Sequence, residues 1–482
     1  MNHRMIRYII GSLIQMEAAM FLLPAFTALL YEETVCIAAF LGSAVLCVIG
    51  GQLLKGKKPE DVTIFSSEGY VSVAVCWVML SICGAMPLYF SGCFPNPVDA
   101  LFEIVSGFTT TGATILGDVE ILPRSVLMWR SFSHWIGGMG VLVFMMALLP
   151  LAGASSMYLM RAESPGPSVG KLVPKVRSTA KILYAIYFIM TVTELLFLLL
   201  AGCPLFDSIN LSFATAGTGG FGVLNSSAGE YNAAIQIILT VFMILFGVNF
   251  NVYFLIYTKN IRDAFRCEEA RIYLGIIAAS ILLISVNTFS MFRGLGETLR
   301  HVSFQVASII TTTGFSTVDF ELWPEFSRTI LVILMFIGAC AGSTGGGIKV
   351  SRVAILAKTI LKELAVMNHP RSVRKTRFEG KPVEHEVLRS INVFLITYLG
   401  IFVLSTLLIS LDGLDGITNF TAVASTINNI GPGLSKVGPT QNFSIYSNLS
   451  KLVLTFDMLA GRLEIFPMLI MCTAGFRRKR WN

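Results

Sequence analysis

Four short stretches of the chain combine small polar residues with a glycine, and their useful chemistry lies in the main chain. They are residues 106–114, 213–221, 311–317 and 428–433. Glycine permits dihedral angles that turn consecutive carbonyl groups to one side, and rings of such carbonyls can replace the hydration shell of a cation. One Thr-Thr-Thr-Gly string is a common turn sequence, but four copies at equivalent places are hard to assign to ordinary loops. The pattern predicts four loops that converge on a cation.

A short amphipathic segment precedes each stretch and begins with an acidic residue: Asp99, Asp207, Glu297 and Asp415. Anions at such positions favour the start of a helix. The segments are too short and too polar to cross a bilayer. We therefore expect half-helices that enter from outside, stop midway and return as extended backbone. Their C-terminal ends, which carry partial negative charge, would face a shared axis and favour a cation.

Long apolar runs must position these loops. Hydrophobic residues make up 54% of the 482 residues, charged residues only 13%, and the mean hydropathy is +0.72. Soluble domains carry about 25% charged residues. We count ten runs near or above the ~20 residues of a membrane helix: 8–30, 34–54, 71–92, 126–152, 181–202, 233–257, 272–292, 329–348, 391–411 and 451–475. The sequence predicts an all-α polytopic membrane protein.

Basic residues collect in alternate loops, and the loops between them lean acidic. The positive-inside rule then places both termini in the cytoplasm. It also explains the net charge of +7 without a nucleic-acid partner. The basic segment 366–385 is either a solvated loop that fixes topology or a docking surface for an acidic partner or lipid headgroups. The nine cysteines show no CxxC spacing and are interpreted as small core residues.

The unit of span, short helix, glycine loop and span occurs four times. This repetition predicts the following organisation: a leading helix pair at 1–60, pore repeats at 61–160, 161–262, 263–365 (with a broken second helix) and 386–482, and the basic cytoplasmic loop at 366–385.

Three further features interrupt the apolar runs. The Gly-rich residues 341–347 would be costly in a helix, and indicate either a kink or an intramembrane loop that obstructs a pore. Arg462 would cost at least ~2.5–3.5 kcal/mol at the bilayer centre; it either pairs with Glu464 or Asp457, or stands in the pore as a barrier to cations. His134 and His301 could relay protons, although simple hydrogen bonding is the favoured interpretation.

The four glycine stretches, together with residues 135–140, 338–349 and 461–464, resemble the bacterial TrkH-type membrane subunit of the Trk/Ktr/HKT potassium transporter superfamily. The likeness covers essentially the whole chain. It implies four pseudo-repeats around one pore, assembled as a homodimer. It also implies a K⁺ selectivity filter at the residues before and at each central glycine: Thr110, Thr111 and Gly112; Thr218, Gly219 and Gly220; Thr312, Thr313 and Gly314; Asn429, Ile430 and Gly431.

The resemblance further implies a gate. Its residues are Gly342, Ser343, Thr344, Gly345, Gly346, Gly347 and Arg462. The second repeat departs most from the family pattern, so Gly217 is an alternative to Gly220. A serine at the first filter glycine is associated with Na⁺ transport in the family, so Gly112 implies K⁺. The imperfect four-fold symmetry implies that Rb⁺ also passes.

The implied function is gated, channel-like K⁺ uptake across the bacterial inner membrane. K⁺ is the transported ion, and no cofactor is expected in this chain. Regulation would come from a cytosolic ring of TrkA-type subunits that bind NAD(H), ATP or ADP. The alternative is a secondary transporter that couples K⁺ to H⁺ or Na⁺. Repeats that share one direction, rather than inverted repeats, favour the channel. The sequence shows no catalytic constellation, so an enzyme is not expected.

Overall fold

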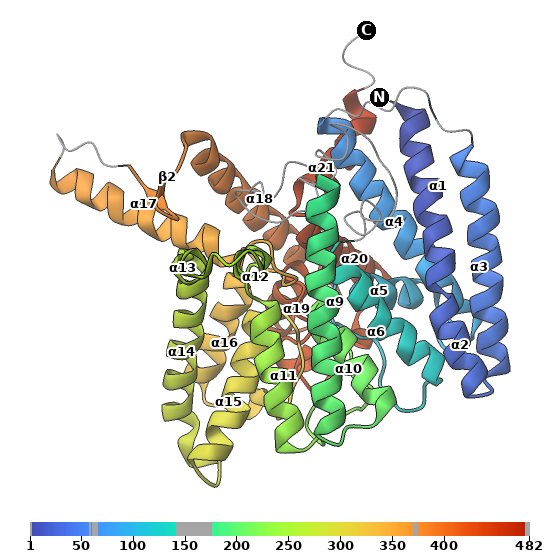
Figure 1. Cartoon of the computed structure of the whole chain (residues 1–482), viewed down its shortest axis with the longest axis horizontal. Coiled ribbons are helices and arrows are strands. Elements are labelled where there is room, and N and C mark those ends of the chain that lie inside the picture. Colours follow the sequence, from blue (N-terminus) through green and yellow to red (C-terminus); the bar gives the residue numbers. More distant parts are fainter. Residues whose placement is uncertain (1, 57–58, 60–65, 141–175, 370–374, 478–482) are drawn as a thin grey trace.

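The computed structural model describes residues 2–56, 59, 66–140, 176–369 and 375–477. Several long helices run roughly parallel to one another, among them α1 (His3–Met20), α3 (Thr34–Lys55), α9 (Val176–Leu200) and α14 (Glu268–Thr288), whereas α17 (Val350–Asn368) lies across them and α18 (His385–Ile409) is strongly inclined (Figure 1). The prediction of an all-α polytopic membrane protein is confirmed. In the described part of the chain, strands are confined to one hairpin of β1 (Arg377–Phe378) and β2 (Lys381–Pro382).

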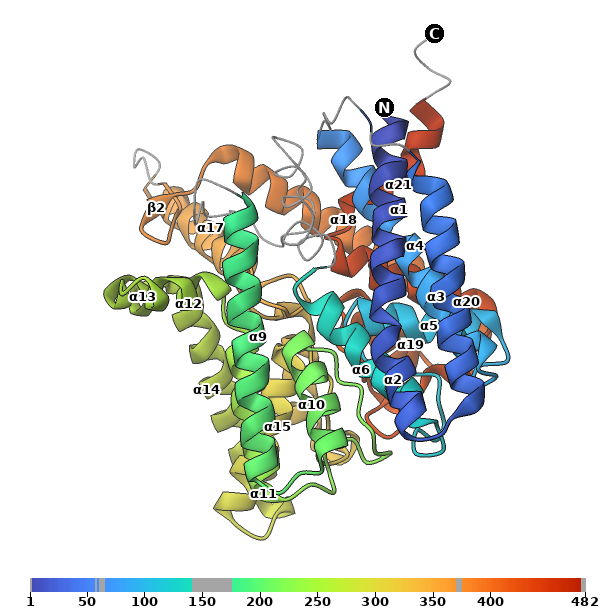
Figure 2. The ribbon, with the colours of Figure 1, turned by 45° about the vertical axis from the view of Figure 1, so that its right-hand side comes forward.

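The leading segment forms an antiparallel pair at one side of the molecule (Figure 2). It consists of α1 (His3–Met20), its continuation α2 (Leu22–Leu30) and the returning α3 (Thr34–Lys55). The two backbones approach closely at glycines, because a Cβ on Gly11 would lie 2.6 Å from the Gly51 carbonyl oxygen. Small residues allow this packing in membrane helices.

Four successive units follow, each with a long helix, a short helix and a second long or broken helix. Their helices are α4 (Ser66–Phe90), α5 (Pro97–Phe108) and α6 (Arg124–Gly138); α9 (Val176–Leu200), α10 (Leu205–Gly217), α11 (Ala233–Phe246), α12 (Phe250–Tyr257) and α13 (Ile261–Arg266); α14 (Glu268–Thr288), α15 (Leu295–Ile310), α16 (Glu325–Ile337) and α17 (Val350–Asn368); and α18 (His385–Ile409), α19 (Gly416–Ile427), α20 (Asn448–Arg462) and α21 (Phe466–Arg477). Single 3₁₀ turns join some of them: η1 (Phe289–Met291), η2 (Phe320–Leu322), η3 (Ser410–Asp412), η4 (Ser435–Val437) and η5 (Phe443–Ile445).

Some of the predicted limits between the repeats fall inside helices, and others lie outside the described residues. The limits at 262/263 and 365/366 fall inside α13 and α17. The limit at 160/161 and much of the predicted span 126–152 lie outside the described residues, as do residues 370–374 of the basic segment.

The ten apolar runs do not all become straight membrane helices. In the described residues, six helices are long and apolar enough to cross a membrane. The pair α11 and α12 would be a seventh, but it bends by 87°. The run at 329–348 ends its helix at Ile337, and the run at 451–475 is divided between α20 and α21. Hydropathy finds apolar stretches, whereas glycine and polar residues decide where the helix stops.

The acidic residues at the short helices stand where they were expected. Asp415 is the N-cap of α19, and its carboxylate accepts from the Thr418 N–H at 3.0 Å. Asp99, Asp207 and Glu297 lie in the first turns of α5, α10 and α15. Their negative charge complements the positive end of each helix dipole.

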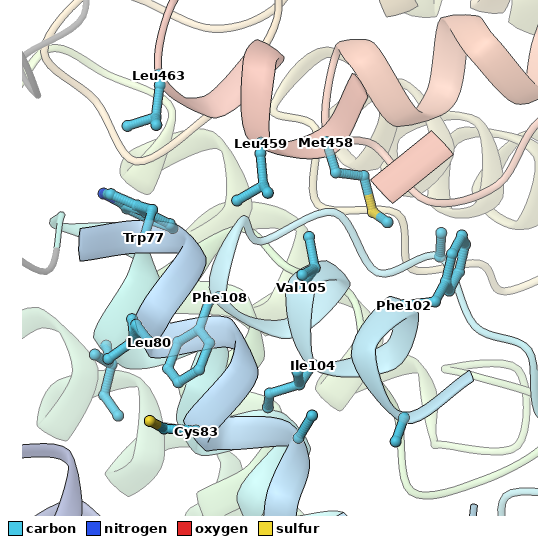
Figure 3. Close-up of a cluster of buried hydrophobic side chains, with 14 of the residues drawn as sticks. Trp77, Leu80, Cys83, Phe102, Ile104, Val105, Phe108, Met458, Leu459 and Leu463 are labelled. Atoms are coloured by element: carbon cyan, nitrogen blue, oxygen red, sulfur yellow. The ribbon is translucent and has the colours of Figure 1, made fainter. Parts of the chain in front are cut away.

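Side chains from two other helices, α4 and α20, fix the position of α5. Phe102, Ile104, Val105 and Phe108 of α5 lie between Trp77, Leu80 and Cys83 of α4 and Met458, Leu459 and Leu463 on and just after α20 (Figure 3). The labelled side chains are buried, so the short helix sits in an apolar cage built by its own unit and the fourth unit. This packing holds a helix that is too short to be stable alone.

Candidate functional site

All four short helices end in the same hydrogen-bonded motif. The N–H of Thr111 bonds to the Ser106 carbonyl at 2.9 Å, and the same step of five residues recurs three times. The other pairs are Gly219 to Ala214 (2.8 Å), Thr313 to Ser308 (2.8 Å) and Ile430 to Ser425 (2.9 Å). This is the Schellman arrangement that closes a helix C-terminus. The four glycine stretches therefore share one local structure despite their different sequences.

The residue that reverses the chain in each motif is left-handed, yet it is not glycine. Thr110, Thr218, Thr312 and Asn429 have φ angles of 57°, 55°, 59° and 55°. For a β-branched residue this conformation is rare and costs about 1–3 kcal/mol. Such strain persists only where the surrounding structure enforces it, which marks these loops as a candidate functional site.

The glycine two residues later also has a positive φ in every loop. The values are 77° for Gly112, 83° for Gly220, 88° for Gly314 and 102° for Gly431. In the second loop Gly217 still belongs to α10, and Thr218 and Gly220 take the two special conformations. The backbone therefore equates Gly220, rather than Gly217, with the other three glycines.

The four loops touch one another in a closed ring. A Cβ on Gly112 would lie 2.1 Å from the carbonyl oxygen of Gly219, and one on Gly220 would lie 2.0 Å from that of Thr313. The third and fourth contacts join Gly314 to the Ile430 oxygen (2.1 Å) and Gly431 to the Thr111 oxygen (2.8 Å). The fourth loop thus returns to the first, and the structure brings all twelve predicted filter residues together.

The carbonyl oxygens of this ring are unusual because all but one of them lack a hydrogen-bond donor in the part of the chain that the structure describes. Within the described residues, the only one of these twelve residues whose carbonyl accepts a hydrogen bond is Gly431, from Ser425 Oγ. Buried backbone carbonyls are nearly always paired. Most of the twelve residues are buried, whereas Gly112, Gly220 and Gly314 are partly exposed. Such a cluster of electron-rich oxygens suits a cation.

The first loop is supported by a buried ion pair. Arg130 of α6 contacts Glu103 of α5 at 2.8 Å, with side-chain exposures of 3% and 0%. The Glu103 carboxylate also accepts from the Thr114 hydroxyl at 2.9 Å and the Ile115 N–H at 3.1 Å. Glu103 therefore fixes the chain just after Gly112, a role that its place in an acidic outer loop did not reveal.

His134 lies between the first two loops. Its Nδ1 is 2.7 Å from the Gly107 carbonyl, and its Nε2 accepts from the Phe221 N–H at 3.3 Å. These partners define a neutral ring that donates through Nδ1. His301 is 2.9 Å from the Thr317 hydroxyl through Nδ1. Both histidines are hydrogen-bonded, as the favoured interpretation expected.

Residues 338–349 form a non-helical loop that presses against one side of the ring. Helix α16 ends at Ile337 and α17 begins at Val350, so the segment is not a kink in a continuous helix. The Gly346 N–H donates to Thr312 Oγ1 at 2.6 Å, and a Cβ on Gly346 would lie 2.3 Å from the Asn428 carbonyl oxygen. The loop therefore contacts a strained residue of the ring directly. Throughout, we call residues 338–349 the inner loop.

Arg462 joins the ring, the inner loop and the end of α6. Its guanidinium donates to Thr110 Oγ1 at 3.2 Å, to the Thr344 carbonyl at 2.8 Å, and to the carbonyls of Gly137 and Gly138. Of the two partners considered for it, Glu464 pairs with Arg352, and Asp457 accepts from Ser405. The guanidinium thus lies beside the ring and the inner loop, where main-chain carbonyls and the Thr110 hydroxyl accept its hydrogen bonds.

Three polar residues around the inner loop were missed by the sequence analysis. Lys349 is buried and donates to the Gly345 carbonyl, across the turn of the loop. Arg352 pairs with Glu464 just after Arg462. Glu269 of α14 accepts from the N–H groups of Ala341 and Ser351 at 2.7 and 3.2 Å. Only Glu269 carried a weak signal, as the second of two acids at the start of an apolar run.

A cation site made of side chains would be an alternative to the ring of main-chain oxygens. Among the described residues, no group of three His, Cys, Asp or Glu side chains is placed to hold a metal ion. The candidate ligands are therefore the main-chain oxygens of the ring.

Comparison with known proteins supports one family along the whole chain. The family profile described as "TrkH: Cation transport protein" matches residues 37–288 and 274–475. The Trk system potassium uptake protein TrkH of Salmonella typhimurium is 35% identical over 99% of this chain and 100% of its own length. TrkG of Escherichia coli, also a Trk system potassium uptake protein, is 32% identical over 98% of this chain and 99% of its own length.

A solved structure agrees with the arrangement of the helices. The crystal structure of the potassium transporter TrkH from Vibrio parahaemolyticus superposes with a TM-score of 0.89 at 32% identity, and covers all of both chains. Because these matches extend over nearly every residue, the chain belongs to the TrkH family of cation transport proteins.

Proposed function

We propose that this chain is a gated, channel-like pore for the uptake of K⁺, and that Rb⁺ also passes. The observation that carries the proposal is the closed ring of carbonyl oxygens at Thr110–Gly112, Thr218–Gly220, Thr312–Gly314 and Asn429–Gly431. Within the described residues, all of these oxygens except that of Gly431 lack a hydrogen-bond donor. Such oxygens can replace the water around a monovalent cation. The choice of K⁺ is supported by the relatives, which are named potassium uptake proteins.

The membrane potential is sufficient to drive this uptake. One elementary charge gains about 2.3 kcal/mol per 100 mV. The proposed four pore repeats share one direction, each with a short helix that ends at the ring. This common direction supports a single pore over the alternating access of inverted repeats.

The inner loop and Arg462 are the proposed gate. The loop contacts the ring at Thr312, and Arg462 contacts it at Thr110. A fixed positive charge at the inner face of the ring opposes the exit of a cation. Opening requires that the loop and the guanidinium move away from the axis.

We further propose that the protein lies in the bacterial inner membrane with both termini in the cytoplasm. The start of α1 and the end of α21 lie at the same end of the molecule (Figures 1 and 2), which is consistent with that topology. A homodimer and a cytosolic TrkA-type ring that binds NAD(H), ATP or ADP complete the proposal. Adding such a subunit to proteoliposomes should make ion flux depend on nucleotide.

Coupling of K⁺ to H⁺ or Na⁺ is the second candidate, and one residue favours it. Asp457 is fully buried next to Met458, whose carbonyl binds Asn429 of the ring at 2.9 Å. Its Oδ1 accepts from Ser405 at 2.7 Å, while its Oδ2 has no partner in the described residues. Obligatory H⁺ movement that is lost in Asp457→Asn would support coupling.

The decisive experiment measures ⁸⁶Rb⁺ flux into proteoliposomes with K⁺ and Na⁺ as competitors. For the wild type we expect K⁺ to compete better than Na⁺, without obligatory H⁺ movement. Gly112→Ser should reduce this preference, because its Cβ would lie 2.1 Å from the Gly219 oxygen at a φ of +77°. Gly117→Ser is the matched control, since a Cβ there meets nothing within 4 Å. Equal competition profiles for wild type and Gly112→Ser would contradict the proposed filter.

A further inference from the structure

Two carboxylates in series connect the hairpin of β1 and β2 with the inner loop. The hairpin lies at the edge of the molecule beside α17 (Figure 1). It is closed by Glu379 and Gly380, both with positive φ, in a two-residue turn between paired strands. Two-residue hairpin turns with positive φ at both positions are tight turns matched to the twist of their strands. The hairpin therefore presents Glu379 in a defined position.

Glu379 caps the N-terminus of α14, although it lies more than 100 residues away in sequence. Its carboxylate accepts from the backbone N–H groups of Glu268 and Glu269 at 3.1 and 3.0 Å. Glu268 returns a bond, because its carboxylate accepts from the Glu379 N–H at 3.0 Å. The first amides of a helix have no partner within the helix, so an anion at this place orients the whole helix end.

Glu269, the second residue of α14, also accepts hydrogen bonds from backbone N–H groups, in this case those beside the inner loop. Its buried carboxylate accepts from Ala341 at 2.7 Å and Ser351 at 3.2 Å, which stand near the two ends of the inner loop. Ser351 lies in the first turn of α17, so Glu269 also caps that helix. Asn249, between α11 and α12, donates to the other oxygen at 3.2 Å. One side chain thus holds the loop at both ends.

A third contact links the hairpin to α17, the helix that follows the inner loop. Lys358 of α17 pairs with Glu268 and donates to the Arg377 carbonyl at 3.0 Å. Displacement of the hairpin would therefore pull on α14 and α17 together. Both helices hold groups that touch the inner loop.

We propose that Glu269 is a positioning residue that keeps the inner loop against the ring, and that Glu379 on the hairpin sets the position of Glu269. The hairpin is then the place where a cytosolic signal is converted into movement of the gate. This inference rests on the proposed function, since it assumes that the inner loop obstructs an ion pore.

The test is ⁸⁶Rb⁺ flux into proteoliposomes that contain the full-length chain alone. Glu269→Gln and Glu379→Gln keep the shape of the side chain and weaken its hydrogen bonds. Each should raise basal flux by about tenfold, the factor that corresponds to one charge-assisted hydrogen bond. The Rb⁺/Na⁺ flux ratio should stay at the wild-type value, because the ring is untouched. Glu384→Gln, an exposed glutamate at the start of α18 that makes no side-chain cap, is the control and should behave as wild type.

A double variant distinguishes a serial linkage from two independent effects. If Glu379 acts through Glu269, Glu269→Gln with Glu379→Gln should give the flux of Glu269→Gln alone. A double variant equal to the product of the two single effects would overturn the linkage. So would an Rb⁺/Na⁺ ratio that falls with rising flux, because that indicates general loosening of the protein. Glu379 is exposed, so its variant tests the idea even if Glu269→Gln does not fold.

Failure of this inference differs from failure of the proposed function. Suppose that wild type and Arg462→Ala both conduct Rb⁺, while the flux of Glu269→Gln and of Glu379→Gln equals that of the control. The proposed pore is then supported, and the proposed linkage between the hairpin and the inner loop is refuted. If neither wild type nor Arg462→Ala conducts Rb⁺, the pore itself is refuted, and the linkage falls with it.

Discussion

Replacement of Arg462 by alanine should increase basal K⁺ and Rb⁺ flux strongly. The guanidinium is 3.2 Å from Thr110 Oγ1 and 2.8 Å from the Thr344 carbonyl. An ion that leaves the ring past Thr110 therefore meets a fixed positive charge, and the inner loop is tied to the same charge. The substitution removes both obstacles at once.

The size of the effect follows from Coulomb's law. At separations of about 4–6 Å and an effective dielectric constant near 20, two like unit charges repel by about 3–4 kcal/mol. Water and the surrounding carbonyl oxygens offset part of this repulsion. A reduction of the barrier by about 2–3 kcal/mol then raises the rate roughly 30- to 150-fold.

The assay is ⁸⁶Rb⁺ uptake into proteoliposomes under a K⁺ gradient, with the amount of protein equalised. Arg462→Lys should give a smaller rise, because lysine keeps the charge but cannot reproduce the fork of donors. Arg328→Ala is the matched control, since that arginine pairs with Glu321 and Glu325 in a partly exposed cluster. Flux in Arg462→Ala equal to that of Arg328→Ala and wild type would refute the role of Arg462 as a barrier and leave it a structural residue.

Two further predictions concern the supports of the ring. Glu103→Gln leaves Arg130 buried without its anion, so we expect a loss of about 3–5 kcal/mol in stability and a clearly lower unfolding temperature in detergent. The control is Glu230→Gln, which replaces an exposed glutamate and should leave the unfolding temperature unchanged. Equal unfolding temperatures for the two variants would contradict the stabilising role of the ion pair. Asp415→Ala removes the N-cap of α19 and should cost about 1 kcal/mol, whereas Asp415→Asn should retain most of the cap. Hydrogen bonds from the Thr418 hydroxyl and N–H lower the pKa of Asp415. Because the folded pKa lies below the unfolded value of about 3.9, the cap contributes fully above that pH and is lost as pH falls through the folded pKa. The difference in unfolding temperature between wild type and Asp415→Ala should therefore be constant from about pH 6 to 8 and shrink near pH 3; a difference that grows in acid would contradict the cap.

Much of the fold was predictable because it depends on local and repeated signals. Long apolar runs define membrane helices, and acidic residues mark the starts of the short helices, as Asp415 shows. The glycines of the loops were identified because left-handed backbone requires them at Gly112, Gly314 and Gly431. The inner loop was one of two interpretations, since a run of glycines is costly in a helix and indicates either a kink or a loop; the end of α16 and the start of α17 decided for the loop.

Other features depended on residues far apart in the chain. Sequence alone left Gly217 and Gly220 as alternatives, and only the end of α10 at Gly217 decided between them. It offered Glu464 or Asp457 as partners of Arg462, but it could not show that Glu464 pairs with Arg352 or that Arg462 donates to the carbonyls of Thr344, Gly137 and Gly138. It also could not show that Glu103 meets Arg130, because Glu103 lies in an acidic outer segment and Arg130 in the separate apolar run 126–152, and only the fold brings the two together.

The sequence by itself determined that this is a membrane protein with four glycine loops, because hydropathy and turn-forming glycines are properties of short segments. Tertiary structure decided that the loops close into one ring and that Glu269 and Arg462 hold the inner loop beside it. Those contacts join residues separated by tens to hundreds of positions. They exist only because packed helices bring distant polar groups together where each must find a partner.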